Sequence, residues 1–262
     1  MGLHSRTSPL RLVWLVAAVL VLGGLFLARS PGSGRGEAVE SGAGCPPGSD
    51  ACRSPAGDER TARTPTVILA SDVCLRGGYL CADLPSRGEI RIARWNEDTD
   101  RIHIRVPRPP ALDRGTARAL QEAVARGLRA WHGRPFPIRV DLSDRPGPED
   151  FAVTWSSALG ERRLGRASTR WTLENGRADL EVTELVLVTR DPWRPERTIR
   201  PSQIELAAAH EMGHALGLPH SDEPRDVMYP ENTATRLTAR DYITMSSLYA
   251  LENGAVVRSV HR

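Results

Sequence analysis

The sequence of 262 residues contains no lysine, so all 35 of its basic residues are arginine. The arginines are scattered along the chain without a polybasic run, and the formal net charge is only +3. A charge this small and this dispersed argues against nucleic acid as a partner. We read the missing lysine as a bias of genome composition and expect the arginines to lie on a solvated surface.

Cysteine is scarce as well. The four cysteines form two similarly spaced pairs, Cys45 with Cys52 and Cys74 with Cys81. Neither pair has the C-x-x-C spacing of a zinc finger. An even number of cysteines in an exported chain favours disulfides, and four cysteines allow three pairings. Among these we expect the two local loops.

The N-terminal region has no clear cleavage site of small residues. Arg6 and Arg11 precede an apolar run from Leu12 to Ala28. As a helix this run is about 26 Å long, just short of a bilayer core. Residues 1–28 are therefore expected to be a signal peptide or a membrane anchor, and we favour the anchor because Phe26 stands where cleavage needs a small residue. Either reading places the protein outside the cytoplasm, membrane-anchored or secreted.

Composition divides the rest of the chain into three parts. Residues 29–87 contain the four cysteines and begin with a stretch rich in glycine, proline, serine and charge, so we expect a flexible linker or pro-like segment. Residues 88–252 are expected to form one α+β domain, and 253–262 a tail. We find no internal repeats.

Hydrophobic periodicity predicts the elements of that domain. Two-residue alternation and apolar runs predict strands, and spacings of three and four residues predict helices. We expect strands at 89–95, 101–106, 138–142, 151–155, 163–171 and 179–188, and helices at 113–132, from 201 onward, and at 238–251. Asp113 is expected to cap the first helix, and Trp131 to pack in the core.

The eleven residues from His210 to His220 carry the pattern H-E-x-x-H-x-x-G-x-x-H. A chance match to its five fixed positions in a chain of this length has a probability of about one in ten thousand. His210 and His214 are four residues apart, so on a helix they lie on the same face and can reach one metal ion. Gly217 permits the left-handed backbone that ends a helix, and the turn returns His220 as a third ligand.

Three protein ligands leave one tetrahedral position open, which is typical of a catalytic zinc and not of a structural one. Glu211 lies beside the first ligand and cannot point at the same place. It can instead hold a water and act as a general base. The sequence therefore predicts a zinc ion bound by His210, His214 and His220, with Glu211 as the catalytic residue.

A second motif follows closely, at Asp226-Val227-Met228-Tyr229-Pro230. Together the two motifs resemble the matrixin branch of the metzincin metalloproteases. This resemblance implies a twisted mixed sheet, a zinc helix, a Met-turn and a C-terminal helix. It also implies that Met228 lies beneath the zinc ligands, and that Tyr229 and Pro230 form a wall of the pocket for the substrate residue after the scissile bond.

The resemblance extends to Leu164-Gly165-Arg166-Ala167, which stands where matrixins have a cleft-edge strand that pairs with an extended substrate. Arg166 replaces a histidine that helps to bind a second, structural zinc in vertebrate members. We therefore predict one zinc. Calcium is common in the family, but the sequence has no calcium-loop string. Leu206, one helical turn before His210, is expected on the floor of the substrate pocket.

The resemblance implies a monomeric zinc endopeptidase that cleaves protein or peptide substrates with a zinc-activated water and Glu211 as general base. The family's P-R-C-G-x-P-D latency string is absent, and Cys74 or Cys81 can serve in its place only if unpaired. Two alternatives remain. One is a catalytically silent matrixin-like module that binds peptides or matrix, and the other is a membrane-tethered structural protein whose zinc stabilises the fold.

Overall fold

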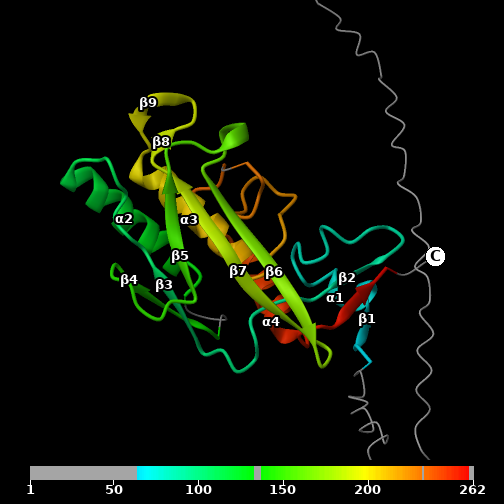
Figure 1. The fold of residues 1–262 in the computed structure, drawn as a ribbon. Coiled ribbons are helices and arrows are strands. Elements are labelled where there is room, and N and C mark those ends of the chain that lie inside the picture. The colour runs from blue at the N-terminus through cyan, green and yellow to red at the C-terminus, as the bar shows by residue number, and fades with distance from the viewer. Residues whose placement is uncertain (1–63, 133–136, 232, 260–262) are drawn as a thin grey trace, which may run out of the picture. The chain divides into compact units, whose positions relative to one another are not determined.

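The computed structural model describes residues 64–132, 137–231 and 233–259 (Figure 1). The segment 1–28 and the pair Cys45 and Cys52 lie outside these ranges, so the expectations about an anchor and about that cysteine pair stay predictions. Within the described ranges, no helix combines the length and the apolar character that a membrane crossing requires.

A five-stranded mixed sheet forms the centre of the domain. Its strands are β3 (Arg101–Arg105), β4 (Arg139–Ser143), β5 (Phe151–Ser156), β6 (Gly165–Glu174) and β7 (Arg177–Val188). Their spatial order is β4-β3-β5-β7-β6, and only β6 runs antiparallel to its neighbour. Strand β6 pairs on one side only, so within the described chain it is an edge strand. The expected α+β fold with a mixed sheet is confirmed.

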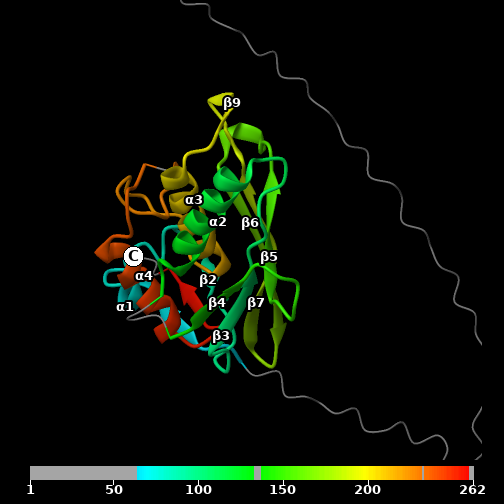
Figure 2. The ribbon, with the colours of Figure 1, turned by 90° about the vertical axis from the view of Figure 1, so that its left-hand side faces the viewer.

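Three helices pack on one face of this sheet (Figure 2). They are α2 (Arg114–Arg129), α3 (Pro201–Ala215) and α4 (Ala239–Ala250). Asp113 caps α2 as expected, because its carboxylate accepts a hydrogen bond of 3.0 Å from the Thr116 backbone N–H. Trp131 is fully buried, and its indole N–H donates to the Ala209 carbonyl of α3. The Trp131 hydrogen bond ties the segment just after α2 to α3, the helix that carries His210 and His214.

The folded part is longer at both ends than the range 88–252. Strand β1 (Val67–Leu69) is followed by α1 (Ala70–Val73), and β2 (Glu89–Arg91) is much shorter than the expected strand at 89–95. A small sheet joins β1, β10 (Val256–Arg258) and β2, with β10 in the middle. Segments this short show no clear periodicity, and each finds its partner far away in the chain. For this reason β1 fell within the expected linker and β10 within the expected tail.

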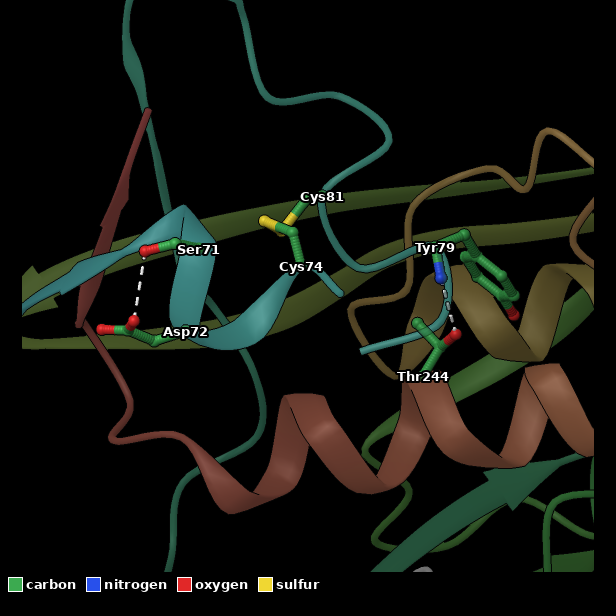
Figure 3. Close-up of a disulfide and its surroundings, with 6 residues drawn as sticks. All are labelled: Ser71, Asp72, Cys74, Tyr79, Cys81 and Thr244. Carbon is green, nitrogen blue, oxygen red and sulfur yellow. Dashed lines mark hydrogen bonds between the residues drawn. A yellow bond between two sulfur atoms is a disulfide. The ribbon is translucent and has the colours of Figure 1, made fainter. Parts of the chain in front are cut away.

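The Cys74–Cys81 disulfide lies in this N-terminal extension (Figure 3), as the expected local pairing requires. Tyr79, inside the disulfide loop, is only 2 % exposed. Its hydroxyl donates to the Asp241 carboxylate at 2.8 Å, and its backbone N–H donates to the Thr244 hydroxyl at 3.1 Å. The loop from Cys74 to Cys81 is therefore fastened to α4 and is not a free linker. With both sulfurs in the bond, neither cysteine is available as a latency ligand.

A hairpin that the sequence did not predict precedes α3. Strands β8 (Arg190–Asp191) and β9 (Arg194–Thr198) form it, with Trp193 in the turn. The hairpin is rich in charged residues and has no apolar face, so it shows no two-residue hydrophobic alternation.

Candidate metal centre

Helix α3 carries His210, Glu211 and His214 in its last two turns. The helix ends at Ala215, and Gly217 adopts a φ of +95°, in the left-handed region where a side chain is strained. A Cβ at this position would also lie 2.6 Å from the Ala93 carbonyl oxygen. The chain therefore turns at Gly217, as expected, and returns His220 to the end of the helix.

The three histidines converge on one point. The Nε2 atom of His214 lies 3.2 Å from that of His210 and 3.1 Å from that of His220. Candidate ligand atoms of the three residues all lie within 4.8 Å of one another. Two nitrogens bound tetrahedrally to zinc at about 2.05 Å would be about 3.3 Å apart. The observed spacings suit a metal of this size.

Hydrogen bonds define the tautomers of two of these rings. The Nδ1 of His210 lies 2.7 Å from the Val227 carbonyl oxygen, and that of His214 lies 3.0 Å from the Leu218 carbonyl oxygen. A carbonyl can only accept, so both Nδ1 atoms carry the proton and donate. The Nε2 atoms then present lone pairs toward one another, an arrangement that favours a cation between them.

Burial keeps the rings uncharged. It lowers the pKa of His214 to about 3, with further lowering by the neighbouring rings of His210 and His220. The pKa of His210 is lowered by the same cause. For the less buried His220, desolvation lowers the pKa and the carboxylate of Asp83 opposes that effect. Neutral imidazoles are the form that binds a metal.

Glu211 lies beside the triad and is 6 % exposed. Burial raises the pKa of its carboxyl group to about 7, against a hydrogen bond from the Ala167 backbone, which lowers it. Gly165 leaves the space for this carboxyl group, because a Cβ there would lie 2.6 Å from Cγ and 2.7 Å from Oε1 of Glu211. A carboxyl group with a pKa near neutrality can both accept and return a proton.

Met228 packs under the histidine helix. It is fully buried, and a Cβ built on Gly213 would lie 2.2 Å from its sulfur. The turn that holds it is closed by the Ser221 backbone N–H, which donates to the Met228 carbonyl at 2.8 Å. The neighbouring Val227 supplies the carbonyl that orients His210. This segment therefore supports the triad from below, where the resemblance expects a Met-turn.

Gly213→Ala tests this contact. The added methyl group meets the sulfur of Met228 and, at 3.1 Å, Cζ2 of Trp131. Both side chains are buried, so we expect the free energy of unfolding to fall by about 1–3 kcal/mol in urea titrations. Gly115→Ala, whose Cβ would meet nothing nearer than 3.3 Å on an exposed turn of α2, is the control. Equal stability of the two variants would contradict the close packing of Met228.

An open cleft of about 690 Å³ runs past the triad. Leu164 and the start of β6, from Gly165 to Ala167, form one side together with the preceding residues, and Pro230 and Thr233 lie on another. Ala207, His210 and Glu211 of α3 also line it, and Trp193 reaches it from the β8–β9 hairpin. The structure therefore brings the expected edge strand, Pro230, Glu211 and the three histidines to one cleft.

Two expected pocket residues lie elsewhere. Leu206 does not line this cleft but packs against the small cluster of Ala209, Val227 and Ala234, and its place on the floor of the substrate pocket stays a prediction. Ala207, one residue later on α3, lines the cleft instead, because the packing of the helix decides which face is open. Tyr229 is half-buried and is also absent from the lining.

Trp193 is the main lining residue that sequence reasoning missed. Its side chain is 56 % exposed although it is large and apolar. A tryptophan in a charged segment just before α3 was the available signal, but only the hairpin shows that it reaches the cleft.

Comparison with known proteins agrees with this geometry. Residues 156–250 match the family model for matrixin peptidases. Over 58 residues the chain is 38% identical to macrophage metalloelastase of Rattus norvegicus. This aligned region covers 20% of this chain and 12% of that protein. Over 143 residues it is 27% identical to metalloendoproteinase 1-MMP of Arabidopsis thaliana, covering 52% of this chain and 38% of the relative. The chain thus spans less than half the length of either relative.

Proposed function

Because this chain carries a matrixin-like metalloprotease domain, we propose that it is a zinc-dependent endopeptidase with its active site at His210, Glu211, His214 and His220. One observation carries the proposal. Three neutral imidazoles present their nitrogens to a single point, and a buried carboxyl group stands next to them in an open cleft. A purely structural metal site would be closed by a fourth protein ligand.

His210, His214 and His220 would hold the zinc. When bound there, zinc supplies a Lewis acid that makes a water a nucleophile at neutral pH and polarises a carbonyl group. Glu211 takes the proton of the attacking water on its carboxylate and passes it to the amine that leaves when the peptide bond breaks. Its buried position keeps it close to both groups and away from bulk solvent.

The backbone of β6 holds the substrate in this proposal. An extended peptide adds as a further strand to the free edge between Leu164 and Ala167, so its scissile bond lies against the triad. Gly165 contributes the space that Glu211 needs. Pro230 forms a wall for the substrate residue that follows the cut, and Met228 supports the ligand helix.

The remaining assignments are also proposals. Residues 1–28 act as signal peptide or anchor, which places the enzyme outside the cytoplasm, secreted or membrane-anchored. The disulfide Cys74–Cys81 suits such an oxidising compartment. The peptidase unit is the 88–252 core extended at both ends by the β1-β10-β2 sheet, and it acts as a monomer on protein or peptide substrates.

Zinc content measured together with peptidase activity tests the proposal. We expect one zinc per chain, loss of cleavage on chelation, and recovery when one equivalent of zinc is returned. Zinc without cleavage of any peptide would instead support the silent binding module. Unfolding on chelation, with no activity before it, would support a structural zinc. The presence of Glu211 argues against the silent module, and a site with only three protein ligands argues against the structural zinc.

A further inference from the structure

A second pocket of about 620 Å³ continues the cleft on the other side of the triad. It shares Ala167, His214 and His220 with the first cleft, so the two regions meet at the metal centre. The pocket then follows β6 through Thr169 to Trp171. We name it the Trp171 pocket. A strand paired along β6 would pass over both regions.

The opposite wall comes from the N-terminal extension. Leu80 of the disulfide loop and Asp83 just after it line the Trp171 pocket. Hydrogen bonds from the Ala82 backbone N–H to the Tyr79 carbonyl and from that of Leu84 to the Cys81 carbonyl fold this segment into successive turns. Since Tyr79 is fastened to α4, the wall is held in place by the fold (Figure 3).

The Trp171 pocket is mostly apolar, with one carboxylate on its wall, that of Asp83. Trp171 is 48 % exposed and presents an indole ring, and Ile90 and Leu180 add aliphatic surface. Arg91 also lines the pocket and keeps its positive charge, but a 2.8 Å hydrogen bond to the Gly254 carbonyl holds its guanidinium at that carbonyl. Asp83 makes no hydrogen bond or ion pair with any residue that the structure describes.

A ligand side chain that satisfies these features has a long apolar stem and a cationic end. Its stem would lie on the aliphatic wall, and its charge would meet the Asp83 carboxylate or the Trp171 ring. Arginine and lysine are the residues of this kind, and the flat guanidinium of arginine also stacks on an indole.

The geometry points to a specificity site: we propose that the Trp171 pocket binds an arginine or lysine of the substrate on the amino-terminal side of the scissile bond. This inference rests on the proposed peptidase function. Pro230, assigned to the residue after the cut, lines the first cleft, so the Trp171 pocket takes residues before the cut. At about 3.3 Å per residue, the path from Ala167 to Trp171 corresponds to about four substrate residues.

Cleavage-site profiling tests the inference. The zinc-loaded full chain digests a proteome-derived peptide library, and mass spectrometry identifies the cut sites. We expect arginine or lysine to be enriched at one position within about four residues before the cut. Asp83→Asn should reduce that enrichment by about threefold to tenfold, and Asp83→Arg should abolish it. Because the Asp83 carboxylate also acts on His220, the enrichment is measured within each variant, relative to its own cleavage of peptides without a basic residue there.

Asp72→Asn is the matched control, because Asp72 is an exposed carboxylate of the same N-terminal extension and lines neither pocket. It should leave the profile unchanged. Cleavage by the parent without a basic preference would overturn the inference, as would an Asp83→Asn profile identical to the parent's, and either result leaves the peptidase function intact. A parent that cleaves no peptide would refute the peptidase function itself.

Discussion

Replacing Glu211 by glutamine is expected to lower turnover by about 10³-fold to 10⁴-fold while zinc still binds. Glutamine has nearly the same shape, so it fits the space beside Gly165 and keeps the histidines in place. Its amide has no basic oxygen that can take a proton from the attacking water. The measurements are the turnover number on a peptide substrate and the zinc content of the purified variant.

Glu205→Gln provides the matched control. Glu205 lies on the same helix but forms a surface ion pair with Arg126, and its side chain is 36% exposed. Its replacement should cost little stability and leave turnover unchanged. A Glu211→Gln variant that cleaves peptides as fast as the parent would remove the general-base role from Glu211. A variant that loses zinc as well would show that the carboxyl group also shapes the metal site.

Replacing Asp241 by asparagine is expected to lower the free energy of unfolding by about 3 kcal/mol. Asp241 is fully buried, and its carboxylate accepts three hydrogen bonds from three residues. The donors are the Tyr79 hydroxyl and the backbone N–H groups of Val227 and Thr238, while the Thr238 hydroxyl donates to Asp226 at 2.6 Å. An asparagine oxygen can replace only one of the two carboxylate oxygens. If the amide NH₂ faces Tyr79, the Tyr79 hydroxyl loses its acceptor, and if it faces Val227 and Thr238, their backbone N–H groups meet another donor.

This network also reaches the metal centre. Asp241 holds the backbone N–H of Val227, and the carbonyl of the same residue orients His210. We therefore expect Asp241→Asn to weaken zinc binding by about tenfold, measured by competition with a chelator of known affinity. Urea titration of the zinc-free protein separately gives the change in the free energy of unfolding.

Asp222→Asn is the comparison for this variant. Asp222 also carries a carboxylate near the Met228 turn, but its side chain is 75% exposed and pairs with Arg240 at the surface. A loss of about 0–1 kcal/mol is expected there. If the two variants were equally stable, the buried hydrogen bonds of Asp241 would have no special weight in the fold.

Local sequence was enough to predict much of the metal centre. A spacing of four puts His210 and His214 on one face of any helix, and Gly217 tolerates the φ of +95° that returns His220. The helix caps at Asp113 and Thr238 are local too, because the capping side chain and the backbone N–H that it accepts from are three residues apart. Such features depend on backbone geometry over a few residues, so a single sequence reveals them.

Other features depend on which surfaces meet. Leu206 and Ala207 are neighbours on one helix, and only the packing of α3 decides which of them faces the cleft. Trp193 lines that cleft because a hairpin without a hydrophobic pattern projects it there. The sequence alone does not show which side chains line the cleft, because each of these residues fits its helix or turn equally well whether it faces the cleft or not.

The sequence by itself thus determined the three converging histidines, the helix that carries two of them and the mixed α+β fold, because these follow from short-range periodicity and turn chemistry. Only the tertiary structure decided the extent of the domain and the shape of the cleft. Strand β1 pairs with β10 from the other end of the chain, and Tyr79 bonds to Asp241, 162 residues later. Long-range pairing of this kind leaves no local pattern, because the two partners are far apart in the sequence and come into contact only when the chain folds.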